Sequence, residues 1–145
     1  MVEFFDAADS ARLAEAFAIR LEVFVDEQGV PRELEIDELD AAGSAAVHAV
    51  VRDGGAAIAT GRLYPHGAAT VGIGRMAVRA THRGRGIGRF LLSELLAEAK
   101  RRAFTRAELS AQVAAAGFYE RLGFVAGGGT YAEAGIEHQK MVRAL

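Results

Sequence analysis

A glycine-rich basic turn constrains this chain more than any other feature of its sequence. The turn reads Arg83-Gly84-Arg85-Gly86-Ile87-Gly88-Arg89, between a strand-like stretch (70–78) and an amphipathic stretch that extends to about residue 103. Glycines at alternate positions let the backbone turn sharply and gather N–H groups at a helix N-terminus, where unpaired donors and the helix dipole attract anions. The sequence therefore predicts a phosphate-binding turn, and the three glycines disfavour a simple flexible basic loop.

Two other kinds of phosphate loop do not match this turn. A Rossmann fingerprint that began at Gly84 would need glycine or alanine at position 89, where the chain has Arg89, and the pattern G-x-x-x-x-G-K-[ST] occurs nowhere. The sequence thus disfavours nucleotide hydrolysis and dinucleotide redox chemistry.

Hydrophobic periodicity predicts the elements on either side of the turn. Asp9 and Ser10 are good N-caps for a first helix, which the helix-breaking residues 29–31 end. We expect strands at residues 47–51, 56–63, 70–78 and 106–111, from 124 and at 137–142, a helix at 86–103, a short helix around 118–122 and a glycine loop at 127–129. This order predicts one domain over residues 1–145, of the α/β or α+β class, in which a mixed sheet carries helices on both faces.

An acidic stretch at residues 32–40 precedes the first long strand. It contains Glu33, Glu35, Asp37, Glu38 and Asp40. A short helix or a loop suits this segment, and runs of like charge usually lie on a solvated face. We therefore expect these carboxylates to be exposed.

The composition excludes several classes of protein. Of the 145 residues 51% are hydrophobic and 25% are charged, which is typical of a folded soluble domain, and a net charge of −2 argues against nucleic acid as a partner. The absence of cysteine excludes disulfides, thiolate metal sites and a cysteine acyl-enzyme, so an acyl group would move directly to its acceptor. An acidic N-terminus and the lack of a long apolar stretch predict a cytoplasmic protein without a membrane partner.

Two motifs, taken together, resemble one family of enzymes. Arg83-Gly84-Arg85-Gly86-Ile87-Gly88 resembles the coenzyme A signature R/Q-x-x-G-x-G/A of GNAT acetyltransferases, and Gly117-Phe118-Tyr119-Glu120-Arg121-Leu122-Gly123-Phe124 resembles their later segment F-Y-x-x-x-G-F. The stretches 20–31 and 134–138 extend the resemblance to short, single-domain bacterial members, so that it covers most of the chain. It implies a GNAT-like, mostly antiparallel mixed sheet, acetyl-CoA as the acyl donor, and a small-molecule or peptide amine as the acceptor.

The resemblance also implies where the donor binds. The main chain at Met76, Ala77 and Val78 would pair with the pantetheine arm, and the turn would wrap the pyrophosphate through Arg83, Gly84, Arg85, Gly86, Ile87, Gly88 and Arg89. Many members carry asparagine six residues before the Phe-Tyr pair, where this chain has Gln112. Glutamine keeps the amide on a longer arm, so Gln112 is expected to contact the cofactor.

Tyr119 is the residue to which the family points as general acid. A phenol near the thioester, and therefore in contact with the cofactor, would donate a proton or a hydrogen bond to the leaving thiolate. The general base is left open among Glu27, Asp37, His48 and His138. Of these, Glu27 lies where the first helix ends near the expected acceptor cleft, and His138 carries an imidazole, a common general base in enzymes. Both also have structural interpretations, as a cap or surface group and as a hydrogen-bonded strand residue.

No histidine spacing typical of a metal site is present, so no metal is expected. The main alternative function is a sensor or regulatory module that holds acyl-CoA without turnover, since a fold alone does not establish catalysis. An RNA-binding domain that uses Arg83, Arg85 and Arg89 is disfavoured by the acidic net charge and the lack of an adjacent aromatic platform. The acceptor, and whether the chain forms a homodimer, are left open.

Overall fold

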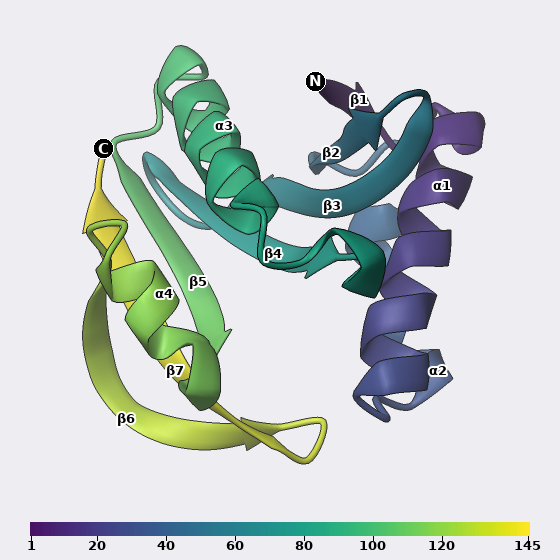
Figure 1. Ribbon diagram of the computed structural model, residues 1–145. Coiled ribbons are helices and arrows are strands. Elements are labelled where there is room, and N and C mark those ends of the chain that lie inside the picture. Colours follow the sequence, from purple (N-terminus) through teal and green to yellow (C-terminus); the bar gives the residue numbers. More distant parts are fainter.

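The computed structural model describes all residues 1–145 and contains one seven-stranded sheet in the order β1-β2-β3-β4-β5-β7-β6 (Figure 1). Only the pair β4 and β5 is parallel, and every other neighbouring pair is antiparallel. The strands are β1 (Val2–Asp6), β2 (Val47–Asp53), β3 (Ala56–Pro65), β4 (Thr70–Val78), β5 (Arg106–Gln112), β6 (Val125–Glu133) and β7 (Ile136–Ala144). The predicted class, a mixed and mostly antiparallel sheet, is confirmed.

Helices cover both faces of this sheet, as predicted (Figure 1). The four α-helices are α1 (Ser10–Arg20), α2 (Arg32–Glu35), α3 (Ile87–Arg101) and α4 (Ala116–Glu120). Alternate residues of β2 show how the faces are filled, because side chains along a strand point to opposite sides. Val50 packs with Leu13 and Ala16 of α1, whereas Ala49 and Val51 belong to the larger cluster on the other face.

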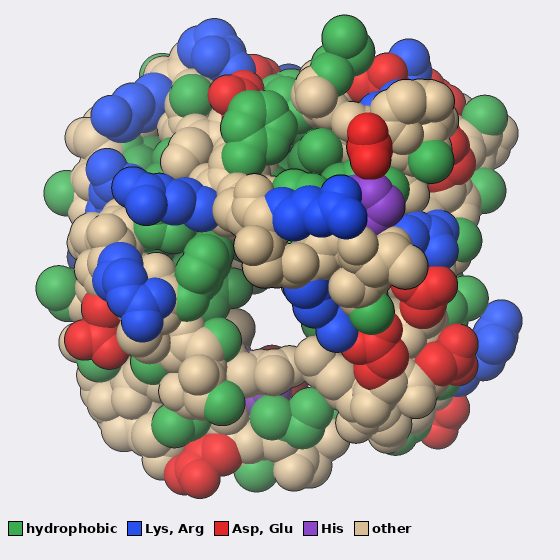
Figure 2. All heavy atoms as spheres, viewed as in Figure 1, with side chains coloured by type: hydrophobic (Ala, Val, Ile, Leu, Met, Phe, Trp, Pro, Cys, Tyr) green, Lys and Arg blue, Asp and Glu red, His purple; other side chains and the backbone are tan.

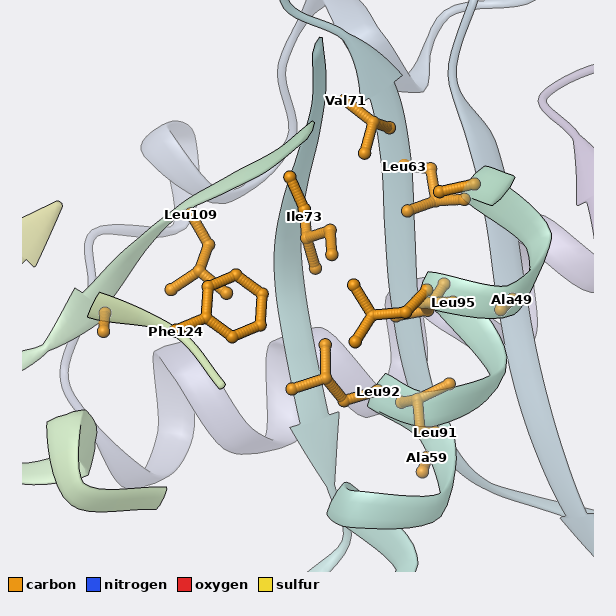
Figure 3. Packing of buried hydrophobic residues seen from close by; sticks show 14 of the residues in the cluster. Ala49, Ala59, Leu63, Val71, Ile73, Leu91, Leu92, Leu95, Leu109 and Phe124 are labelled. Carbon is orange, nitrogen blue, oxygen red and sulfur yellow. The ribbon is translucent and has the colours of Figure 1, made fainter. Parts of the chain in front are cut away.

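The larger cluster is the main hydrophobic core (Figure 3). It packs the buried face of α3 onto the middle of the sheet, with Phe124 closing one side. The buried α3 residues are Leu91, Leu92, Leu95, Leu96 and Ala99. The helix predicted at 86–103 is confirmed apart from its end, because α3 ends at Arg101 and Ala103 has a φ of 68°.

The first helix continues past α1 as a π-helix over Leu21–Glu27, and Gly29, with a φ of 73°, ends it. Asp9 caps the start as predicted, because its side chain accepts a hydrogen bond from the backbone N–H of Arg12 at 3.1 Å. None of the helices is both long enough and apolar enough to cross a membrane.

Three details of the fold differ from the sequence-based expectation. Strand β1 was not predicted, although Val2 and Phe4 pack on one face of the sheet and Phe5 on the other. Glycines 127–129 lie within β6, where the pairing with β7 shifts between Ala126 and Thr130, and do not form a separate loop. The acidic stretch is partly buried, because Glu35 and Asp40 face the interior and not the solvent.

Strands β4 and β5 diverge, and this opening positions the site (Figure 1). They pair only over Thr70–Ile73 and Arg106–Leu109, so the remainder of β4 has no strand partner on the β5 side. On its other side β4 carries a bulge against β3, where Arg75 has a φ of 51°. A bulge bends the strand that contains it, which is consistent with the divergence.

Candidate functional site

The glycine-rich turn leaves several backbone donors free at the start of α3. The N–H groups of Ile87, Gly88 and Arg89 have neither a backbone acceptor nor a capping side chain. Gly84 and Gly86 have φ values of 78° and 76°, and a Cβ atom at either position would meet nothing within 4 Å. The turn therefore needs glycine for its conformation and offers open space above free N–H groups, which suits a phosphate.

A cavity of about 490 Å³ lies beside this turn, and we call it the turn cavity. It is lined by most of the predicted cofactor residues: Met76, Ala77, Val78, Arg83, Gly84, Gly86, Ile87, Gly88 and Arg89. Arg85 does not line it, and Arg85 and Arg89 are exposed and form no ion pair. The two guanidinium groups near the turn are thus available to an anion.

A second cavity, of about 360 Å³, occupies the opening between β4 and β5, and we call it the sheet cavity. Figure 2 shows an opening in the middle of the molecule, which in Figure 1 lies between β4 and the β6–β7 hairpin. Gln28, Met76 and Ala115 line both cavities, so the two adjoin at these residues. A long ligand in the turn cavity could therefore reach a small one in the sheet cavity.

Tyr119 lines the sheet cavity from α4. Phe118 and Phe124 pack edge-on against its ring. Burial raises the pKa of its phenol above the usual 10.0, and the hydroxyl forms no hydrogen bond within the chain. Tyr119 therefore keeps its proton at neutral pH and has that proton free to donate.

His138 lines the same cavity from β7 and is only 8% exposed. Its Nδ1 lies 2.7 Å from the carbonyl oxygen of Ile136. A carbonyl can only accept, so in this hydrogen bond Nδ1 donates, and the neutral ring carries its lone pair on Nε2. The ring is thus held in the tautomer that can take up a proton at Nε2.

The other candidate bases lie elsewhere. Glu27 lines the turn cavity and not the sheet cavity, and its carboxylate accepts a hydrogen bond of 2.6 Å from Arg83. Asp37 and His48 line neither cavity. His48 is 1% exposed and stacks on Phe5, and burial lowers its pKa. Of the four predicted candidates, only His138 shares a cavity with Tyr119.

Gln112 lines the sheet cavity at the end of β5, and its amide nitrogen donates a hydrogen bond of 2.7 Å to the side-chain oxygen of Gln28. The predicted residues Tyr119, Gln112 and His138 are thus brought together around one cavity, with the residues of the turn around its neighbour.

A buried ionic network, which the sequence did not predict, reaches the sheet cavity through Glu35 and Arg62. Arg20, on the inner side of α1, binds Glu35 at 2.8 Å and both carboxylate oxygens of Asp40 at 2.8 and 2.9 Å. Arg62 binds Asp37 at 2.7 Å and Asp40 at 3.0 Å. The predicted solvated face is therefore wrong for Glu35 and Asp40, which are buried because arginines from α1 and β3 neutralise them.

The same contacts shift the titration of the network. Burial by itself would raise the pKa of Asp40, but hydrogen bonds from Arg20 and from the backbone of Asp37 outweigh it and lower that pKa to about 2. The sequence contained one sign of this arrangement, because Arg20 follows Leu13 and Phe17 at helical spacing on the apolar side of the first helix.

Comparisons with known proteins agree with this geometry. The sequence model of the acetyltransferase (GNAT) family matches residues 12–124. The uncharacterized N-acetyltransferase YjcF of Bacillus subtilis (strain 168) is 35% identical over 141 residues, which cover 94% of this chain and 96% of YjcF. A solved structure from Lactobacillus plantarum superposes with a TM-score of 0.91 at 33% identity and covers 100% of this chain and 97% of its own. An acyl-CoA N-acyltransferase from Pseudomonas aeruginosa superposes with a TM-score of 0.89 at 34% identity, over 99% of both chains. A turn with free N–H groups, the adjoining cavities and these matches lead to one conclusion: the chain belongs to the GNAT family of acetyltransferases.

Proposed function

We propose that this protein transfers an acetyl group from acetyl-CoA to a primary amine that binds in the sheet cavity. The observation that carries the proposal is the junction of the two cavities at Met76, with Tyr119 in the wall of one and the glycine turn in the wall of the other. A donor whose phosphates bind at the turn would extend its reactive end to that junction.

The chain's own groups suit such a donor. The free N–H groups of Ile87, Gly88 and Arg89 would hold the pyrophosphate, with Arg85 and Arg89 near enough to add positive charge. The stretch of β4 from Met76 to Val78 has no strand partner on its β5 side, so its free backbone groups can pair with the amide groups of a pantetheine arm as an added strand would.

Acetyl-CoA supplies the acetyl group as a thioester. In the proposed step the amine nitrogen forms a bond to the acetyl carbon and the carbon–sulfur bond breaks. His138 takes the amine's proton at Nε2, and the Tyr119 hydroxyl donates to the departing sulfur. We assign the base to His138 rather than Glu27, because Glu27 lies in the other cavity and is paired with Arg83.

The experiment that tests the proposal is thiol release from acetyl-CoA in the presence of a panel of primary amines. We expect amine-dependent release by the wild-type chain, and a loss of release in the Tyr119→Phe and His138→Gln variants while acetyl-CoA still binds. Tight binding of acetyl-CoA without release for any amine would favour the alternative, a non-catalytic acyl-CoA sensor.

Other expectations stay predictions. One sheet takes strands from both ends of the chain, which supports a single domain over residues 1–145. A cytoplasmic location, the lack of a metal, of nucleic acid and of a membrane partner, and a homodimer each need their own measurement.

A further inference from the structure

The sheet cavity is lined by several charged side chains, but only one of its carboxylates lacks an arginine partner. Glu35 is paired with Arg20 at 2.8 Å and with Arg75 at 3.4 Å. Glu133, on the β6–β7 hairpin, has no arginine or lysine partner, and its side chain is 59% exposed. Its one ion-pair contact is with His138, whose Nε2 lies 3.6 Å from Glu133 Oε2.

The arginines of the cavity offer little to a negatively charged acceptor. Arg62 and Arg75 both contact Asp37, and together with Arg20 they face three carboxylates: Glu35, Asp37 and Asp40. These six charges cancel, so the network as a whole is neutral. Glu133 therefore leaves the cavity with one uncompensated negative charge, which attracts a cation and repels an anion.

The distance between Glu133 and His138 limits the length of a ligand that contacts both residues. An ammonium bound to Glu133 and a neutral amine beside His138 Nε2 would each lie about 2.8 Å from its partner. Because the two partner atoms are 3.6 Å apart, the two nitrogens can be separated by about 9 Å at most. An aliphatic chain of roughly two to six methylene groups fulfils that condition.

We propose that the acceptor is a short aliphatic diamine, which Glu133 holds by one ammonium group while the other amine reacts beside His138. This inference rests on the proposed function, whose transfer step it leaves unchanged. Glu133 recognises the nitrogen that does not react, so it determines specificity and takes no part in the bond exchange.

Three acceptors of the same length test the proposal: 1,4-diaminobutane, n-butylamine and 4-aminobutanoate. They differ in the group at the far end, which is cationic, apolar or anionic. We expect kcat/KM to be about two- to fivefold higher for the diamine than for butylamine, the range of one partly exposed charge pair, and lowest for 4-aminobutanoate. Equal use of the three, or a preference for 4-aminobutanoate, would overturn the proposal.

The variant Glu133→Gln should bring the ratio of kcat/KM for the diamine to that for butylamine close to one, since butylamine has no second nitrogen to lose. The ratio is the readout because Glu133 also lies 3.6 Å from His138 Nε2, so its loss affects the base equally for both amines. Glu137→Gln is the matched control, because Glu137 lies in the same hairpin, bonds Thr130 at 2.7 Å and lines neither cavity. It should keep the wild-type preference. A preference that survives in Glu133→Gln would contradict the assignment.

Binding without turnover separates this inference from the proposed function. Calorimetry measures the affinity for 1,4-diaminobutane of the chain saturated with coenzyme A, and this measurement does not depend on acetyl transfer. If no amine releases thiol but the diamine binds and Glu133→Gln weakens that binding about two- to fivefold, the proposed reaction fails and the cation site stands. If other amines release thiol and the diamine binds no better than butylamine, the reaction stands and the cation site fails.

Discussion

The side-chain amide of Gln112, at the end of β5, donates a hydrogen bond of 2.7 Å to that of Gln28, just after the π-helix. The two residues are 84 positions apart in the sequence. Their contact joins the two walls of the opening between β4 and β5 near the point where the two cavities adjoin, because Gln28 lines both. From the position of Gln112 relative to Tyr119 the sequence predicts a contact with the cofactor, but it does not reveal this partner for the Gln112 amide.

We predict that Gln112→Ala raises the KM for acetyl-CoA more than it lowers kcat. Without the amide, Gln28 loses its anchor and the junction loosens, which affects the placement of the donor more than the proton transfers at Tyr119 and His138. A rise of about three- to tenfold in KM corresponds to the loss of one hydrogen bond. Steady-state kinetics separate the two parameters. A drop confined to kcat would mean that Gln112 acts in the chemical step.

Gly86→Asp should abolish binding of acetyl-CoA. The substitution places a side chain on a residue whose φ is 76°, which strains the backbone. It also adds a negative charge beside the free N–H groups that would bind a phosphate. Gly43→Asp is the matched control, because Gly43 has a φ of 87°, a Cβ there would meet nothing within 4 Å, and it lines neither cavity. Calorimetry on folded protein should detect binding in the control and none in Gly86→Asp; comparable affinities in both would refute a phosphate site at the turn.

Local patterns account for what the sequence predicted well. The glycine turn and the helix after it are contiguous, so spacing alone was enough to locate them. The buried pair of Arg20 and Asp40 is not local, since it forms only when α1 and the acidic stretch meet. Strand β1 is five residues long and gives too short a pattern to recognise. Periodicity also does not reveal which atom of His138 is free, because that depends on a hydrogen bond to the Ile136 carbonyl.

Gly72→Ala should destabilise the fold, because Tyr64 lies directly over this glycine from the neighbouring strand, and an added Cβ would overlap its ring. Relief requires Tyr64 to move, which we expect to lower the free energy of unfolding by about 1–3 kcal/mol. Gly74→Ala is the control, since a Cβ there would meet only one Tyr64 atom, at 3.9 Å. Urea denaturation compares the two variants. Equal stability would mean that Tyr64 relocates without cost.

Acid should destabilise the protein in two stages. Burial lowers the pKa of His48 below 6.5 in the folded chain. As the pH falls below 6.5, His48 takes up a proton more readily in the unfolded chain than in the folded one. The free energy of unfolding therefore decreases in this range. Folding lowers the pKa of Asp40 from 3.8 to about 2. The ionised Asp40 therefore contributes about 2 kcal/mol to the free energy of unfolding above pH 3.8, and this contribution is lost as the pH falls from 3.8 to about 2. Urea denaturation as a function of pH should show both stages. The variant His48→Gln should remove only the stage near pH 6.5. If that stage persists in the variant, another group causes it.

Tyr119→Phe separates catalysis from binding. If the hydroxyl protonates the departing sulfur, its interaction strengthens mainly in the transition state, so kcat should fall while the affinity for acetyl-CoA hardly changes. We expect a loss of about 10²-fold, the lower end for a positioned general acid, because a thiol is already a fair leaving group. The phenyl ring keeps the contacts with Phe118 and Phe124, so the free energy of unfolding should change little.

Turnover by the wild type should rise with pH as the amine loses its proton, and it should fall again only above pH 10.0, because burial raises the pKa of the Tyr119 phenol. Kinetics with one accepted amine across this pH range measure both effects. Unchanged turnover in Tyr119→Phe would remove the general acid from the mechanism and leave the acetyltransferase assignment intact, since His138 and the cavity junction do not depend on that hydroxyl.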